Sequence, residues 1–86
     1  MGEINKNSFV EFKTLFEALS AIVNDKGMTW EEKHKAIFSE PLANRICVVG
    51  MMSVPDVQSS DKVEVETFYT AVYHRYSYLE VYLGAN

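Results

Sequence analysis

Residues Asp61 to Leu83 read DKVEVETFYTAVYHRYSYLEVYL, and this segment determines the architecture that the rest of the chain must fit. It contains all five tyrosines of the chain and neither glycine nor proline. Apolar residues recur in it at intervals of three and four over about six turns, which is the period of a helix with one hydrophobic face. The members of this stripe are Val65, Phe68, Val72, Tyr76, Leu79 and Leu83. The pattern predicts a long C-terminal helix over residues 62–83, which Gly84 is expected to close.

The same segment also has the composition of β-strands, which leaves a second fold open. Val, Thr and Tyr are strand formers, and side chains of different character alternate over residues 63–67 and again over 76–83. A hairpin would have to turn at His74–Arg75, where the Gly, Asn or Asp that tight hairpins usually need is missing. We therefore favour the helix, and an α+β fold with a C-terminal hairpin is the alternative.

The predicted helix has more aromatic surface than a chain of this size can bury on one side. At about 100° per residue, Tyr69 and Tyr73 flank the hydrophobic stripe, whereas Tyr78 and Tyr82 lie about 80–120° from its centre. Tyrosine is enriched in protein–protein interfaces, although a tyrosine at a domain edge can also be half-buried with its hydroxyl in water. Arg75, on the same helix, is expected to pair with acids or stack on tyrosine. The candidate partner-binding residues are Tyr69, Tyr73, Arg75, Tyr78 and Tyr82.

A first helix is predicted after a flexible arm formed by residues 1–7. Ser8 and Glu11 have the spacing of a capping box, in which two side chains satisfy the free amides at a helix start. A hydrophobic stripe follows at helical intervals. Its members are Phe9, Phe12, Leu15, Phe16, Leu19, Ile22 and Val23. Beyond its end, Gly27 fits the left-handed position that often follows a helix C-terminus.

Two shorter elements are predicted in the middle of the chain. Thr29 and Glu32 form a second capping box, and Trp30 in the first turn is expected to fill the core, because Trp is highly buried on average. Pro41 breaks this helix and suits the first position of a third. Residues 45–52 fit either that helix or a short buried strand, because their apolar run is continuous and partly β-branched.

The remaining connection completes the predicted architecture. Residues 53–60 contain Pro55 and Asp56 and are predicted to form a surface loop. Asp61 and Glu64 then have the spacing of a third capping box, at the start of the C-terminal helix. Together these signals predict one all-α domain over residues 1–86, a small bundle of three to four helices with a long C-terminal helix.

Composition and charge narrow the functional classes. Hydrophobic residues make up 48% of the chain and charged residues 23%, so it is expected to fold rather than remain disordered. The net charge of −4 disfavours direct binding to nucleic acid, which uses Lys and Arg to neutralise phosphates. The longest apolar run, residues 46–52, is far shorter than the ~20 residues that span a bilayer. The single cysteine, Cys47, indicates a reducing compartment, so we expect a cytoplasmic protein without membrane association.

No catalytic, metal or cofactor site is predicted. Metal sites need clustered ligands, whereas His34, His74 and Cys47 are far apart in the sequence. The adjacent acids Glu31 and Glu32 suit the positive end of a helix dipole and need no acid–base role to explain them. The chain has no glycine-rich phosphate loop and no nucleophile motif. We therefore expect that the protein is not an enzyme and uses no cofactor.

One segment resembles a group of phage proteins. It consists of Met28, Thr29, Trp30, Glu31, Glu32, Lys33, His34, Lys35, Ala36, Ile37, Phe38 and Ser39. In short uncharacterised proteins of bacteriophages and prophages, a similar Thr/Ser-Trp-Glu-Glu-Lys-His stretch leads into Ile-Phe-Ser, with an arginine a few residues further on, here Arg45. The resemblance implies a phage or mobile-element origin and supplies no catalytic residues.

A function follows from this resemblance by analogy. Small acidic helical proteins of phages commonly bind a protein of the bacterial host and inhibit or redirect it, for example a defence nuclease or a transcription or replication factor. Two alternatives remain open. One is a structural homodimer, in which the surplus aromatic residues pair across a two-fold axis. The other is an immunity- or antitoxin-type protein that neutralises a toxin.

Overall fold

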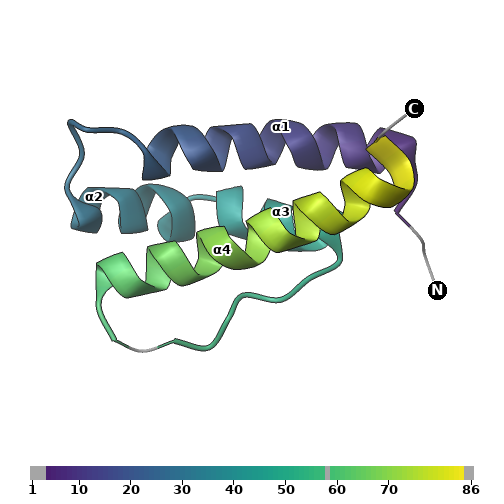
Figure 1. Ribbon diagram of the computed structural model, residues 1–86. Helices are drawn as coiled ribbons and strands as arrows, with labels where there is room; N and C mark the ends of the chain where they lie inside the picture. The colour runs from purple at the N-terminus through teal and green to yellow at the C-terminus, as the bar shows by residue number, and fades with distance from the viewer. Residues whose placement is uncertain (1–3, 58, 85–86) are drawn as a thin grey trace.

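The computed structural model describes residues 4–57 and 59–84, and every regular element among them is helical (Figure 1). The elements are α1 (Lys6–Val23), α2 (Trp30–His34), the π-helical segment η1 (Lys35–Ser39), α3 (Leu42–Gly50), α4 (Asp61–Leu79) and the π-helical segment η2 (Glu80–Gly84). This confirms the predicted all-α bundle with a long C-terminal helix. The alternative hairpin is wrong, because α4 continues without interruption through His74 and Arg75.

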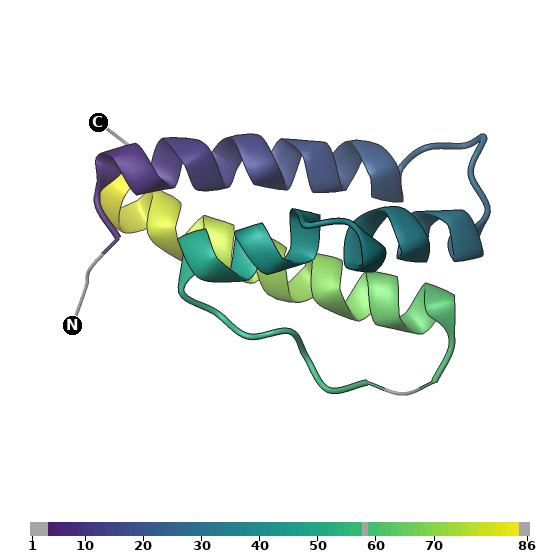
Figure 2. The same cartoon turned by 180° about the vertical axis from the view of Figure 1, so that it is seen from behind.

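The two long helices form the frame of the molecule. Figures 1 and 2 show α1 along one side and α4 running obliquely beneath it; α3 packs against α1, α2 packs against α4, and η1 contacts both α1 and α4. In both views the end of α4 and η2 lies beside the start of α1. The loop between α3 and α4 returns along the outside of the bundle from one end to the other. The beginning of α1, the end of α4 and the end of α3 are thereby brought to the same end of the molecule.

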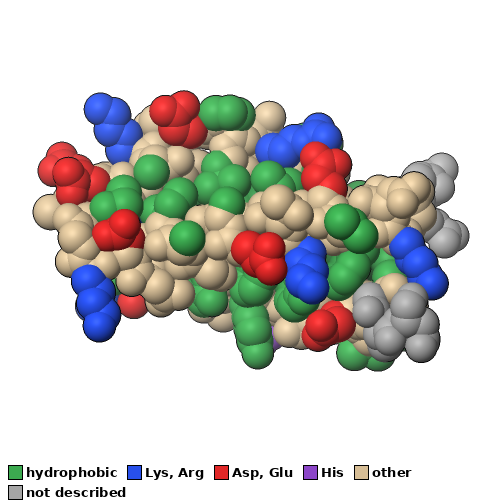
Figure 3. All heavy atoms as spheres, turned by 90° about the horizontal axis from the view of Figure 1, so that it is seen from above, with side chains coloured by type: hydrophobic (Ala, Val, Ile, Leu, Met, Phe, Trp, Pro, Cys, Tyr) green, Lys and Arg blue, Asp and Glu red, His purple; other side chains and the backbone are tan. Residues whose placement is uncertain are grey.

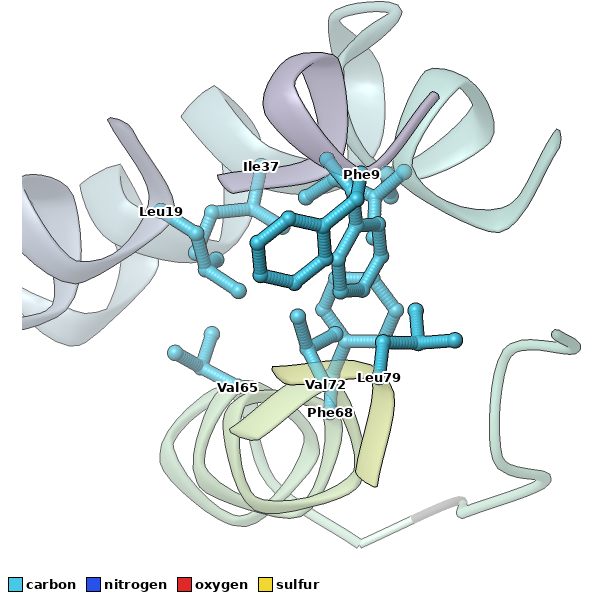
Figure 4. Packing of buried hydrophobic residues seen from close by; sticks show 10 residues of the cluster. Phe9, Leu19, Ile37, Val65, Phe68, Val72 and Leu79 are labelled. Atoms are coloured by element: carbon cyan, nitrogen blue, oxygen red, sulfur yellow. The ribbon is translucent and has the colours of Figure 1, made fainter. Parts of the chain in front are cut away.

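The core lies between α1, α4 and the segment from η1 to α3. Figure 4 shows Phe9, Leu19 and Ile37 directed from one side toward Val65, Phe68, Val72 and Leu79 of α4. Phe12, Leu19, Ile37, Ile46, Val65 and Val72 are fully buried. Each such side chain contributes on the order of 1.5–3 kcal/mol through its removal from water. The predicted stripe of α4 is therefore the core-facing side of the helix, with Tyr76 and Leu83 partly buried at its edge.

The helix starts differ from the prediction at two of three capping boxes. The box at Thr29 and Glu32 is confirmed, since Glu32 N–H donates to Thr29 Oγ1 and Thr29 N–H donates to Glu32 Oε1. The box at Ser8 and Glu11 is wrong, because Asn5 caps α1 and accepts a hydrogen bond from Ser8 N–H. Residues 6 and 7 of the predicted arm accordingly belong to α1, and residues 1–3 lie outside the described part of the chain.

The predicted capping box at the start of α4 is also wrong. Ser60 takes the capping position, where its Oγ accepts a hydrogen bond from Val63 N–H. Asp61 lies inside the first turn, and Glu64 contacts His34 instead of reaching back to the cap. The physical reason is competition: a serine one residue earlier already satisfies the free amide, which leaves both acids available for a histidine.

The turn after the first helix also differs from expectation, and the open choice for the third element is decided. Gly27 does not adopt a left-handed conformation, and its N–H instead donates to Asp25 Oδ1 in a tight turn. Residues 45–50 are helical rather than extended, with Pro41 at the cap immediately before α3. The left-handed residue after α3 is Met51, with a φ of 54°.

Lys33 connects α2 to the end of α1. Its side chain is only 7% exposed, and Nζ donates a 2.7 Å hydrogen bond to the carbonyl of Val23, the last residue of α1. The same Nζ lies 4.2 Å from the centre of the Trp30 ring. Trp30 is partly buried and packs against the core from its edge rather than filling it.

Candidate functional site

The five residues predicted to bind a partner divide into two groups on different sides of α4. Tyr69 and Tyr73 face Phe16 of α1, whereas Arg75, Tyr78 and Tyr82 line a groove near the end of the bundle. The structure therefore brings three of the five together and separates the other two from them.

Tyr69 and Tyr73 belong mainly to the packing between α1 and α4. The ring of Tyr69 stacks on Phe16 with ring centres 5.7 Å apart, and its hydroxyl lies 3.4 Å from Ser20 Oγ. Tyr73 meets Phe16 at 6.1 Å, while 49% of Tyr73 stays exposed. Figure 3 shows the face that carries α1, where hydrophobic side chains are interspersed with charged ones. These two tyrosines already have partners inside the molecule, so a docking role is not needed to explain them.

Tyr78 and Tyr82 are the aromatic residues that the core does not explain. Their exposed fractions are 53% and 69%, and their rings pack on one another with centres 4.8 Å apart. An apolar pair of this kind in water is typical of an interface rather than of an isolated surface. Tyr82 lies in η2, the π-helical segment that follows α4.

A groove of about 410 Å³ lies beside this aromatic pair. We call it the C-terminal groove; its lining consists of Ile4, Met51, Arg75, Tyr78, Leu79, Tyr82 and Leu83. These residues come from the segment before α1, the end of α3 and the last turns of α4 and η2, which meet at one end of the bundle. The groove is therefore a product of tertiary structure and not of one helix.

Arg75 is the charged residue among the described members of this lining, and its position is constrained. Its Nε donates a 2.8 Å hydrogen bond to the carbonyl of Gly50, and its guanidinium carbon lies 5.6 Å from the centre of the Tyr78 ring. An arginine held at Nε has two further amino groups with which it can donate. Among the described residues that line the groove, none is acidic.

Met51 lines the groove in a strained conformation. A left-handed backbone costs an ordinary L-residue on the order of 1–2 kcal/mol, and such strain tends to collect at functional sites. Met51 is nonetheless 46% exposed, with a flexible thioether side chain of the kind that adapts to varied partners. Sequence reasoning missed Met51 and Ile4, because nothing in the local pattern indicates that they meet the C-terminal helix.

A second polar cluster joins α2 to the start of α4. His34 Nε2 lies 2.6 Å from Glu64 Oε1, and Nδ1 lies 3.9 Å from Asp61 Oδ1. A pocket of about 270 Å³ adjoins this cluster, where residues 54–57 of the loop pass Phe38 and His34. The contact holds the loop end of α4 against α2 and uses the Glu64 carboxylate, which Ser60 leaves free by capping the helix. Within residues 4–57 and 59–84, no group of three or more His, Cys, Asp or Glu is arranged to hold a metal ion.

Two partly buried titratable groups have altered acidity. Partial burial raises the pKa of the Cys47 thiol. The pKa of the Tyr76 phenol is also raised, first by burial and then by the charge of Glu80, whose carboxylate accepts a 3.3 Å hydrogen bond from the Tyr76 hydroxyl. Neither group lines the C-terminal groove.

Comparison with known proteins identifies no relative. No protein-family model matches the chain, and neither curated proteins nor solved structures give a significant match. The resemblance of residues 28–39 to phage proteins therefore stays a prediction. None of the helices in the described part of the chain combines the length and apolar character needed to cross a bilayer.

Proposed function

We propose that this chain is a small interaction protein that binds another protein through the C-terminal groove. The observation that carries the proposal is the exposed Tyr78–Tyr82 pair beside the groove. Large aromatic residues in such positions contribute a major share of binding energy at interfaces, because they lose much apolar surface to a partner at a small cost in conformational entropy.

The kind of partner follows from the resemblance to phage proteins. We propose that the chain acts in the cytoplasm of a bacterial host, where it modulates or inhibits a host protein such as a defence nuclease or a transcription or replication factor. Neutralisation of a toxin would use the same groove and the same chemistry. In each case the bound protein is the target, and the chain itself carries out no reaction.

A pull-down from bacterial lysate tests this function. The tagged wild type is compared with a Tyr78→Ser/Tyr82→Ser variant and with Tyr73→Ser as the matched control. Tyr73 is nearly as exposed as Tyr78 but lies on a different side of α4. We expect mass spectrometry to find a protein retained by the wild type and by Tyr73→Ser, and lost from the double variant.

Circular dichroism of the three proteins makes the comparison interpretable. The double variant removes exposed side chains and is expected to keep the helical spectrum of the wild type. Capture of the same proteins by all three chains would contradict the proposed groove. Capture of the chain's own copies alone, together with a dimer in light scattering, would favour the homodimer instead.

A further inference from the structure

The chemistry of the C-terminal groove restricts the kind of partner that it fits. Resting on the function proposed above, we infer that the groove binds an acidic segment of another protein, in which a carboxylate contacts Arg75 and a neighbouring apolar side chain enters between Met51 and the tyrosines.

Charge is the first observation behind this inference. The chain has 12 acidic and 8 basic residues, yet the described lining of the groove contains one arginine and no carboxylate. An acidic segment would meet mutual repulsion over most of the surface, but exposed charges are largely screened beyond about 8 Å at physiological salt. Contacts inside the groove therefore decide which segment binds, and the described lining there carries a positive charge.

The position of Arg75 is the second observation. Because Nε already donates to the Gly50 carbonyl at 2.8 Å, the plane of the guanidinium is held before a partner arrives. The two remaining amino groups form the planar fork that matches the two oxygens of a carboxylate. A pre-oriented side chain loses less conformational entropy on binding than a free one.

The apolar lining supplies the third observation. Tyr78 and Tyr82 present ring faces and hydroxyl groups together, while Met51 offers an adaptable side chain on the opposite segment. A carboxylate alone would leave this surface exposed to water. The occupant that satisfies both parts of the groove carries an apolar side chain beside its acid.

The chemistry of the groove disfavours two other occupants. A two-fold dimer places the same patch of both copies in one interface, so two Arg75 side chains would share it without a carboxylate from the described lining. Nucleic acid would present several phosphates, and its binding depends on neutralising them with multiple Lys and Arg side chains. One arginine on an acidic chain does not meet that requirement.

Selection from a displayed library of random peptides tests the inference directly. The bait is the full chain, and peptides are also selected in parallel on Tyr78→Ser/Tyr82→Ser so that those independent of the groove can be removed. We expect the remaining peptides to share Asp or Glu next to a large apolar residue. The inference is overturned if the remaining peptides show no enrichment of acidic residues or are enriched in basic ones. It is also overturned if no selected peptide depends on the groove.

A charge swap at Arg75 gives the second readout. The consensus peptide and a version with Lys in place of its acids are titrated against wild type, Arg75→Gln and Arg75→Glu. We expect Arg75→Gln to weaken binding of the acidic peptide about tenfold or more, as charge-assisted hydrogen bonds imply. Arg75→Glu should instead bind the Lys peptide more tightly than the acidic peptide. If Arg75→Glu still binds the acidic peptide more tightly, the inference is overturned.

Controls separate this inference from the proposed function and from loss of folding. Arg75→Lys keeps the charge and should keep the acidic preference at reduced affinity, and Tyr73→Ser should bind the acidic peptide as the wild type does. Circular dichroism identifies any variant that has unfolded. In that case, the affinities for the acidic peptide and the Lys peptide are compared in Arg75→Lys alone. Groove-dependent peptides of neutral sequence would refute the acidic partner while leaving the interaction protein intact.

Discussion

Gly50 is a residue where one added methyl group should be damaging. A Cβ at this position would overlap the ring of Phe12, which is completely buried. Overpacking of this kind costs about 1–3 kcal/mol, whereas the gain in helix propensity from Gly to Ala is at most about 1 kcal/mol. We therefore expect Gly50→Ala to lower the free energy of unfolding by about 1–2 kcal/mol in urea titrations.

The matched control for this prediction is Gly27→Ala. Gly27 is exposed, and the nearest atom that its added Cβ would meet is a flexible carboxylate oxygen at 3.3 Å. We expect its free energy of unfolding to change by no more than about 0.5 kcal/mol. Equal effects of the two substitutions would show that the Phe12 ring moves aside at little cost.

At the scale of the element, Lys33 stabilises the C-terminal end of a helix to which it does not belong. The last turn of α1 has no basic residue of its own, and Lys33 reaches across from α2 to the Val23 carbonyl. A positive charge at a helix C-terminus interacts favourably with the macrodipole. We expect Lys33→Met to keep the apolar stem over Trp30 but to lower the free energy of unfolding by about 1–2 kcal/mol.

Lys35→Met is the control that isolates this effect, because it makes the same change in net charge at an exposed position close by. Urea denaturation of the two variants should give a loss of stability in Lys33→Met that Lys35→Met does not share. Equal stability of both variants would mean that the hydrogen bond to Val23 adds nothing beyond what water provides.

Helices were easier to predict than their ends, and the reason is physical. The stripe from Val65 to Leu83 repeats over many residues, so one exception changes little in the pattern. A cap depends on one side chain, and here Asn5 and Ser60 compete successfully with the predicted boxes at Ser8 and Asp61. The spacing of residues alone could not indicate which side-chain oxygen accepts the hydrogen bond from the free backbone N–H group.

At the scale of the whole molecule, the groove could be predicted only in part. The sequence showed that the last helix has more aromatic residues than one buried face can hold, and Tyr78 and Tyr82 are indeed exposed. The division of the tyrosines depends on Phe16, and the groove depends on Met51, both distant in the sequence. Because tertiary packing creates these neighbours, the periodicity of one helix could not distinguish Tyr69 from Tyr78.

The whole fold should lose stability at alkaline pH, because two of its groups resist deprotonation. The pKa values of Cys47 and Tyr76 are raised above their ordinary values of 9.0 and 10.0. Between the ordinary and the raised pKa, the folded chain holds a proton that the unfolded chain has released, so stability falls as pH rises. We expect the free energy of unfolding to decline from about pH 9 upward, by at most about 1.4 kcal/mol per pH unit for each group.

Urea titrations from pH 7 to alkaline pH measure this decline. The control is a Cys47→Ala/Tyr76→Phe variant, which keeps the aromatic stacking of residue 76 on Phe9 and Phe16. The free energy of unfolding of this variant should decline less steeply with pH. Parallel curves for the wild type and this variant would mean that neither proton is held more tightly in the fold than in the unfolded chain.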